Sequence, residues 1–153
     1  MTAQLLSFSI AGQLCGIEAC FVREVRPLPQ RITRTPACAP AVLGVSNLRG
    51  RIAAVISLRR CLGLDDAARG TREMCLVVEH KGELYSLAVD EVGLVLSLQG
   101  NDEPVPPTLD ARWRAAMTGV CRTGGGLLAV LDIPGMIDAL CRNEKEKTPP
   151  EGL

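Results

Sequence analysis

Short stretches in which hydrophobic and polar residues alternate dominate the chain, and long helical patterns are rare. Near the N-terminus, Leu6, Phe8 and Ile10 alternate with serines, which predicts a strand with one buried face. The turn formers at residues 11–13 and the apolar residues at 14–17 predict that this strand returns as a hairpin. The pattern therefore favours β-structure from the start of the chain.

The same criteria predict most of the remaining elements. Further strands are predicted at residues 45–48, 51–58, 74–79, 83–88, 89–98, 117–122 and 127–131. Residues 18–25 have nearly helical spacing and are predicted to bend into an extended run, after which the prolines at 27, 29 and 36 exclude a helix. Helical segments are predicted at residues 40–43, 58–62 and 133–141, and residues 142–153 are predicted to be a disordered tail.

Many short strands with turns between them and few helices predict a mainly β fold, either a barrel or a sandwich. The chain of 153 residues is long for one five-stranded barrel. Two small five-stranded barrels around a shared core, with short helices and a C-terminal helix, fit the number of predicted strands. The sequence shows no convincing internal repeat.

The composition is that of a globular protein, with 47% hydrophobic and 22% charged residues. Aromatic residues make up only 3%, so we expect a core of aliphatic side chains. No apolar run approaches the roughly 18 residues of a membrane span, so no membrane insertion is expected. The first basic residue is Arg23, and polar residues interrupt the apolar stretch before it, which predicts a cytoplasmic protein without a signal peptide.

The seventeen basic residues balance seventeen acidic ones, but they are unevenly distributed. From Val22 to Arg60 there are eight arginines and one acidic residue, Glu24, which gives 8 − 1 = +7. This segment indicates an acidic partner surface, a nucleic acid, or arginines that pair with the acidic remainder of the fold. A nucleic-acid-binding β-barrel that uses residues 22–60 is therefore an alternative function, although only Phe21 lies nearby for base stacking.

Few residues could carry catalysis or bind a metal. The seven cysteines form no Cys-x-x-Cys pair and predict neither a disulfide framework nor a zinc site. A cysteine-dependent enzyme would need a base, and the only histidine, His80, lies in a predicted hairpin turn where we expect it to be solvated. Asp90 and Glu91 are adjacent on a predicted strand, so they face opposite sides. We therefore expect no catalytic residue, no metal and no cofactor.

Residues 44–50 are the most informative segment. Gly44 and Gly50 bracket a short predicted strand, which indicates two positions with unusual backbone torsions or close approach. Arg49 lies on the turn between them, where a guanidinium can pair bidentately with a carboxylate. Because Glu24 is the only acidic residue from Val22 to Arg60, we predict an ion pair between Glu24 and Arg49.

This segment, Gly44-Val45-Ser46-Asn47-Leu48-Arg49-Gly50, resembles the central motif of the CheW-like family, the chemotaxis coupling proteins. Other matches occur in the same order as in the family. They are Val22-Arg23-Glu24-Val25, Thr35-Pro36, Ala88-Val89-Asp90-Glu91-Val92 with Val95-Leu96, and Leu131-Asp132-Ile133. The resemblance covers roughly residues 4–141 and is more specific than any single motif.

The resemblance implies one CheW-like domain at residues 4–141, made of two intertwined β-barrels with the final helix packed against them. It implies a non-enzymatic adaptor that bridges the cytoplasmic tips of chemoreceptors to the regulatory domain of a CheA-type histidine kinase, within membrane-associated arrays and without nucleic acid. The groove between the barrels would take the receptor's helical hairpin. The residues implied in receptor and kinase binding are Val22, Glu24, Val25, Gly44, Asn47, Leu48, Arg49, Gly50 and Val89.

Two positions depart from the family pattern. Ala54 and Ser57 stand where the family usually has a proline and an aspartate. The aspartate would cap the following helix, and we expect Ser57 to replace it in that role.

Overall fold

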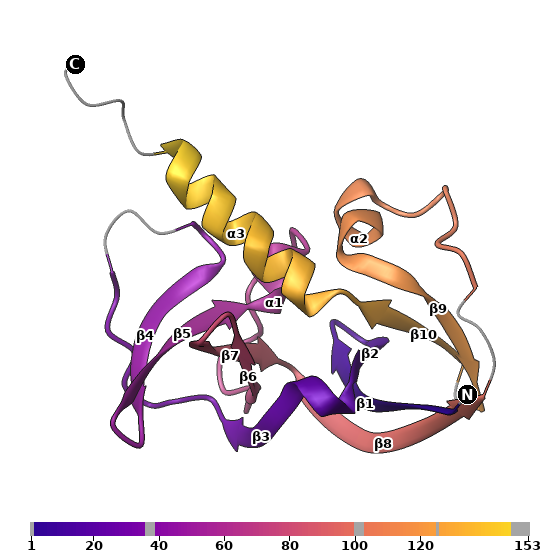
Figure 1. Cartoon of the computed structure of the whole chain (residues 1–153), viewed down its shortest axis with the longest axis horizontal. Coiled ribbons are helices and arrows are strands. Elements are labelled where there is room, and N and C mark those ends of the chain that lie inside the picture. The colour runs from indigo at the N-terminus through magenta and orange to yellow at the C-terminus, as the bar shows by residue number, and fades with distance from the viewer. Residues whose placement is uncertain (1, 36–38, 100–102, 125, 148–153) are drawn as a thin grey trace.

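A computed structural model of the protein describes residues 2–35, 39–99, 103–124 and 126–147, and within them the strands form two five-stranded sheets (Figure 1). Sheet A has the order β8-β1-β2-β10-β9, with β1 at Thr2–Ile10, β2 at Gln13–Glu18, β8 at Glu91–Gln99, β9 at Met117–Thr123 and β10 at Gly126–Leu131. Sheet B has the order β3-β6-β7-β5-β4, with β3 at Val22–Pro27, β4 at Val42–Leu48, β5 at Arg51–Ser57, β6 at Met74–His80 and β7 at Glu83–Val89. The helices are η1 at Ala19–Phe21, α1 at Leu58–Cys61, α2 at Ala111–Ala116 and α3 at Ile133–Lys147.

The mainly β fold with two five-stranded sheets and short helices is confirmed. Two local predictions are wrong, and one helix was not predicted. The helical turn at 40–43 is absent because β4 begins at Val42, where backbone pairing with β5 prevails over the local preference of Pro40. Helix α2, capped by Asp110, has no predicted counterpart. Helix α3 continues beyond Cys141 to Lys147, so the predicted tail begins too early, and residues 148–153 lie outside the described part of the chain.

The two sheets are built in the same way. Each has an edge strand, β8 or β3, beside an antiparallel hairpin, β1–β2 or β6–β7. A second hairpin, β9–β10 or β4–β5, joins the first through a parallel strand pair. The chain contributes β1 and β2 to sheet A, then builds all of sheet B, and returns to complete sheet A. The structure thus contains an internal repeat that the sequence does not reveal.

The registers of the two sheets agree residue by residue. Val45 pairs with Ala54 in sheet B, and Val120 pairs with Ala129 in sheet A, so both positions differ by 75 (120 − 45 and 129 − 54). In each half, a residue in the segment that follows the edge strand makes the same closing bridge, from Thr33 to Val45 and from Glu103 to Val120. Backbone geometry is therefore repeated although few side chains are.

One core serves both sheets. It contains apolar residues from sheet A, sheet B and α3, with a single aromatic ring among the largest fully buried side chains. Its largest members are Phe8, Ile10 and Ile17 from sheet A, Ile56, Leu76 and Leu87 from sheet B, Leu58 from α1, and Ile133 and Ile137 from α3. The expected aliphatic core is confirmed. Figure 1 shows α3 starting between the sheets and running over sheet B.

His80 does not lie free in a turn as predicted. It ends β6, and its Nε2 lies 2.9 Å from the Asp138 Oδ1 of α3. Lys81 Nζ donates to the same oxygen at 3.1 Å. The only histidine of the chain therefore helps to hold α3 on sheet B, a contact between elements that no local pattern indicates.

Asp90 occupies the point where the chain leaves β7 of sheet B and enters β8 of sheet A. Its carboxylate accepts two hydrogen bonds from the Arg59 guanidinium, at 2.7 and 2.6 Å, and one from the Ala11 N–H, at 2.7 Å. Arg59 belongs to α1 beside sheet B, and Ala11 belongs to the β1–β2 turn of sheet A. Only 18% and 13% of the Arg59 and Asp90 side chains are exposed. One carboxylate thus connects the two halves of the molecule.

We predict that Asp90→Ala lowers the free energy of unfolding by about 3–5 kcal/mol, because it leaves the Arg59 guanidinium mostly buried without its partner. Asp66→Ala is the matched control. Asp66 also pairs with an arginine of α1, Arg60, at 2.8 Å, but its side chain is 62% exposed. The control should therefore cost only about 0–1 kcal/mol. Urea denaturation measures both, and equal losses would contradict the proposed role of Asp90.

The same contacts predict an acid-dependent stability. The hydrogen bonds from Arg59 and from the Ala11 N–H lower the pKa of Asp90. A lowered carboxyl pKa contributes stability that is complete above the unfolded value of about 3.9 and is lost as the pH falls through the folded value. The stability difference between wild type and Asp90→Asn should therefore be constant from about pH 5 to 7 and shrink below about pH 4. Urea titrations across this range test it, and a constant difference down to about pH 2.5 would refute it.

Candidate partner-binding site

The tip of the β4–β5 hairpin is a tight two-residue turn. Arg49 and Gly50 both have positive φ, 52° and 85°, as a type I′ turn requires. The Asn47 Oδ1 accepts a hydrogen bond from the Gly50 N–H at 2.8 Å, which holds the turn from one side. Asn47 and Gly50 thus have backbone roles at the tip, and they leave the Arg49 side chain to project from it.

The predicted ion pair between Glu24 and Arg49 is confirmed. The Arg49 Nη2 lies 2.8 Å from the Glu24 Oε2, and the two side chains are 76% and 22% exposed. Glu24 belongs to β3 and Arg49 follows β4, and these strands are the opposite edges of sheet B. The pair can form because sheet B curls, and Thr33 pairs with Val45 across the same gap. The ion pair therefore closes the sheet at the surface.

Gly44 is required by a close approach of the backbone. Its φ is +145°, and a Cβ at this position would lie 2.3 Å from the Thr33 carbonyl oxygen. Thr33 in turn exchanges two backbone hydrogen bonds of 2.8 Å with Val45. Gly44 is itself buried, so it shapes the site and does not offer a contact surface.

The implied apolar site residues differ in accessibility. Val25 is exposed on β3, whereas Val22 is half-buried against the main core. Leu48 is half-buried over a small cluster on sheet B. Val89 was expected to line or shape a partner-facing surface. It is fully buried at the end of β7, so it does not line one, and a shaping role stays a prediction. The core takes its side chain because the following residue, Asp90, forms the connection between the sheets.

Six of the eight arginines between Val22 and Arg60 pair with carboxylates of the same fold. Their pairs are Arg23–Glu79, Arg26–Glu24, Arg49–Glu24, Arg51–Glu79, Arg59–Asp90 and Arg60–Asp66. The interpretation in which the arginines pair with the acidic remainder of the fold is therefore confirmed for Arg23, Arg51, Arg59 and Arg60. Arg26 and Arg49 instead share Glu24, which belongs to the basic segment itself. A nucleic-acid-binding barrel receives no support. Glu79 was not singled out from the sequence, because its partners come from β3 and β5.

The departure at Ser57 has the expected consequence. The Ser57 side chain caps α1 by accepting a hydrogen bond from the Arg60 N–H at 3.2 Å. This places Arg59 and Arg60 on the first turn of α1, from which they reach Asp90 and Asp66. The loss of an aspartate at this position is therefore compensated locally.

Three of the cysteines are poor nucleophiles. Burial raises the pKa of Cys15 and Cys75 to about 12, and that of Cys61 to about 11, which opposes formation of the thiolate. Within the described ranges, no group of three or more metal-ligating side chains is close enough to hold an ion. Cys38, like Pro36 of the motif match, lies outside the described residues.

Two apolar grooves occupy equivalent places on the two sheets. The groove on sheet B has a volume of about 470 Å³ and is bordered by α3, and the groove on sheet A has about 370 Å³ and is bordered by α2. Five lining positions correspond between them, namely Val42, Val45, Ile52, Ala54 and Glu83 with Met117, Val120, Leu127, Ala129 and Gln13. The internal repeat thus extends to the surface.

Comparison with known proteins agrees with this architecture. The family model for the CheW-like domain matches residues 4–141. The chain is 27% identical to the chemotaxis protein CheW of Rhizobium meliloti, over 85% of this chain and 84% of that protein. It is 28% identical to the chemotaxis protein CheW of Thermotoga maritima, over 92% and 91%.

A solved structure has the same fold. The crystal structure of the scaffolding protein TtCheW from Thermoanaerobacter tengcongensis aligns with a TM-score of 0.77 and 28% identity, and the alignment covers 89% of this chain and 88% of that one. The sequence motifs, the two equivalent sheets and the family match over most of the chain lead to the same assignment. This protein belongs to the CheW-like domain family.

Proposed function

We propose that this protein is a non-enzymatic adaptor that couples the cytoplasmic tips of chemoreceptors to the regulatory domain of a CheA-type histidine kinase. Its similarity to chemotaxis CheW proteins and to a scaffolding protein supports this role. The observation that carries the proposal is the closed β4–β5 hairpin, in which Glu24 orients an exposed Arg49. This places a charged group beside apolar side chains on a surface held by backbone pairing.

The surface around this hairpin combines the features of a specific docking site. Val25 and Ile52 are exposed apolar residues near the charged tip. Apolar contacts supply most of the affinity in such interfaces, and charges at the rim select the partner and its orientation. Gly44 and the bridge between Thr33 and Val45 keep the hairpin in one position. An adaptor needs this rigidity because it must present two partners in a fixed relation.

The proposed place of action is the cytoplasmic side of membrane-associated receptor arrays. Among the described residues, no helix is long and apolar enough to cross a membrane. Recruitment would therefore depend on protein contacts. In an array, many weak contacts act together, so individual interfaces need only moderate affinity.

We predict that Arg49→Glu leaves the protein folded but abolishes its capture by a chemoreceptor cytoplasmic fragment or by the kinase regulatory domain. The glutamate would repel Glu24 and reverse the charge at the tip. Because Arg49 is 76% exposed, the free energy of unfolding should change by no more than about 1 kcal/mol. Pull-down and isothermal titration calorimetry measure binding, and circular dichroism measures folding.

Arg122→Glu is a matched control, because Arg122 pairs with Glu103 at 2.8 Å at an equally exposed position on sheet A. It should retain capture by the receptor fragment. The double variant Glu24→Arg/Arg49→Glu re-forms the ion pair with reversed polarity. If the double variant recovers partner binding, the ion pair has a positioning role. If binding is still lost, Arg49 contacts the partner directly. Unchanged binding by Arg49→Glu itself would refute the proposed site.

A further inference from the structure

The edge strands β3 and β8 correspond residue by residue. Val22 of β3 lies opposite Val78, and Val92 of β8 lies opposite Phe8. Val92 is therefore equivalent to Val22 and follows it by 70 residues (92 − 22), and Phe8 is equivalent to Val78 and precedes it by 70 residues (78 − 8). Both strands have their register shift directly after this valine. The backbone surfaces around β3 and β8 can therefore be compared position by position.

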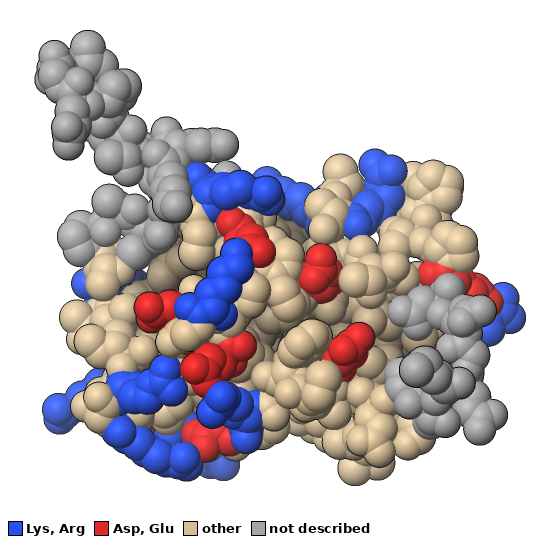
Figure 2. Space-filling view, viewed as in Figure 1, with Lys and Arg blue, Asp and Glu red and all other residues tan. Residues whose placement is uncertain are grey.

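The side chains on these two surfaces have opposite character. On sheet B, four arginines and two glutamates form two ion-paired groups, one around Glu24 and one around Glu79. Together we call these groups the arginine cluster, which consists of Arg23, Arg26, Arg49, Arg51, Glu24 and Glu79. The equivalent residues on sheet A are Gly93, Leu96, Gly124, Gly126, Leu94 and Ser9. All six charged residues are thus replaced by uncharged ones. Figure 2 shows blue and red side chains together at the lower left and a mostly tan surface over β1 and β8.

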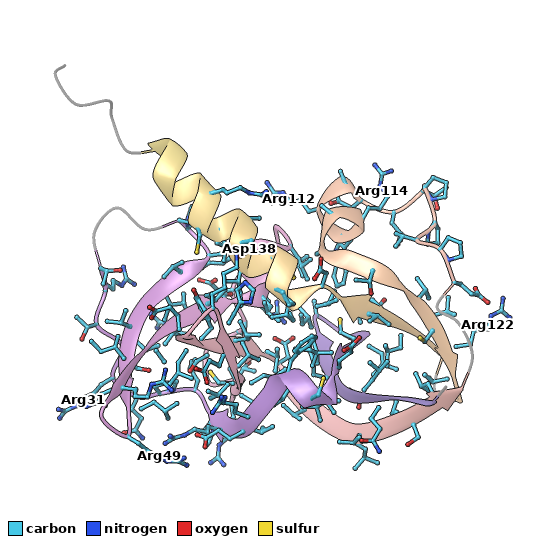
Figure 3. All side chains as sticks on the ribbon, viewed as in Figure 1. Arg31, Arg49, Arg112, Arg114, Arg122 and Asp138 are labelled. Carbon is cyan, nitrogen blue, oxygen red and sulfur yellow. The ribbon has the colours of Figure 1, made fainter. Side chains whose placement is uncertain are left out.

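The arginine cluster is layered. Each glutamate is shared by two arginines, so Glu24 holds Arg26 and Arg49, and Glu79 holds Arg23 and Arg51. The glutamate side chains are only 22% and 25% exposed, whereas the four arginines are between 44% and 76% exposed. The carboxylates therefore lie beneath the guanidinium groups. Figure 3 shows Arg49 at the outer edge of this region.

This arrangement leaves positive charge at the surface. The cluster has a net charge of 4 − 2 = +2, counted over its six residues. A guanidinium has five N–H donors, and one shared carboxylate cannot satisfy those of two arginines. The Arg51 Nη2 also donates to the Gly82 carbonyl at 3.2 Å. The remaining donors belong to largely exposed side chains that the glutamates already hold in place. A partner carboxylate would meet pre-ordered donors and so lose less side-chain entropy on binding.

We propose that the arginine cluster docks an acidic protein surface and that the six equivalent positions of sheet A, none of which is charged, do not. This inference rests on the proposed adaptor function and gives the partner-binding site its chemistry. Two surfaces with the same backbone geometry then receive different partners, because only one of them carries the arginine cluster. Like charges would exclude a basic partner from sheet B, so the cluster fixes which end of the adaptor faces which neighbour.

The first test uses an acidic probe that does not depend on the identity of the partner. We expect a hexaglutamate peptide, titrated into the ¹⁵N-labelled protein, to shift the amide signals of Arg23 and Arg51 but not those of Gly93 and Gly126. The shifts should disappear at high salt because exposed charges are screened. Shifts spread evenly over all surface arginines, or absent from the cluster, would overturn the proposal.

The second test changes the charge of the cluster without touching the Glu24–Arg49 pair. The double variant Arg23→Gln/Arg51→Gln should weaken hexaglutamate binding by about threefold to tenfold. Arg112→Gln/Arg114→Gln removes the same charge from exposed positions of α2 and should leave binding unchanged. Thermal denaturation of both variants checks that they fold. An equal loss in the two variants would mean that the arginine cluster has no special role.

The third test separates this inference from the proposed function. Binding of the chemoreceptor fragment and of the kinase regulatory domain is measured from low to high salt. Loss of affinity for one of them, both with salt and in Arg23→Gln/Arg51→Gln, identifies the acidic partner. Salt-independent binding of both, unchanged in the variant, would refute the inference and leave the adaptor function standing. Failure of both to bind, with hexaglutamate still bound at the cluster, would refute the adaptor function alone.

Discussion

The carboxylate of Asp90 is the contact on which the arrangement of the two sheets depends. It lies in the connection from β7 to β8 and binds Arg59 beside sheet B and the Ala11 N–H of sheet A. A mostly buried charge is stable only when its partners are in place, so the three groups constrain one another. The shared core favours association of the sheets without fixing their angle, since apolar burial is non-directional. The hydrogen bonds of Asp90 add direction.

The two halves show how one backbone pattern can carry different chemistry. The pairing of Val45 with Ala54 in sheet B is equivalent to that of Val120 with Ala129 in sheet A. Each half closes its sheet through an equivalent parallel strand pair and an equivalent bridge. Alternation of apolar and polar residues supplies most of what this requires, together with a glycine at the close approach of Gly44 to Thr33, and many sequences provide such alternation. The surface positions are free of that constraint. Sheet B uses them for the arginine cluster, and sheet A leaves them uncharged.

The candidate site was partly predictable. The Glu24–Arg49 pair could be predicted because Glu24 is the only acidic residue in its basic segment and because the surrounding motif resembles that of CheW-like proteins. The burial of Val89 could not be predicted, since the direction of its side chain depends on the change of sheet at the next residue. The contribution of Glu79 was not predicted, because its partners Arg23 and Arg51 lie on strands that meet only in the folded sheet.

Local pattern alone determined the strands, the hairpin turns and the cap of α1, because alternation, turn residues and Ser57 act over a few neighbouring positions. Helix α3 was recognised, but its length was not, since no stop signal marks its end. The tertiary structure alone decided the strand order, the internal repeat, the anchoring of α3 through His80 and Asp138, and the contact of Arg59 with Asp90. Each of these joins residues distant in sequence, and their energies depend on burial and geometry that exist only after the sheets have paired and packed.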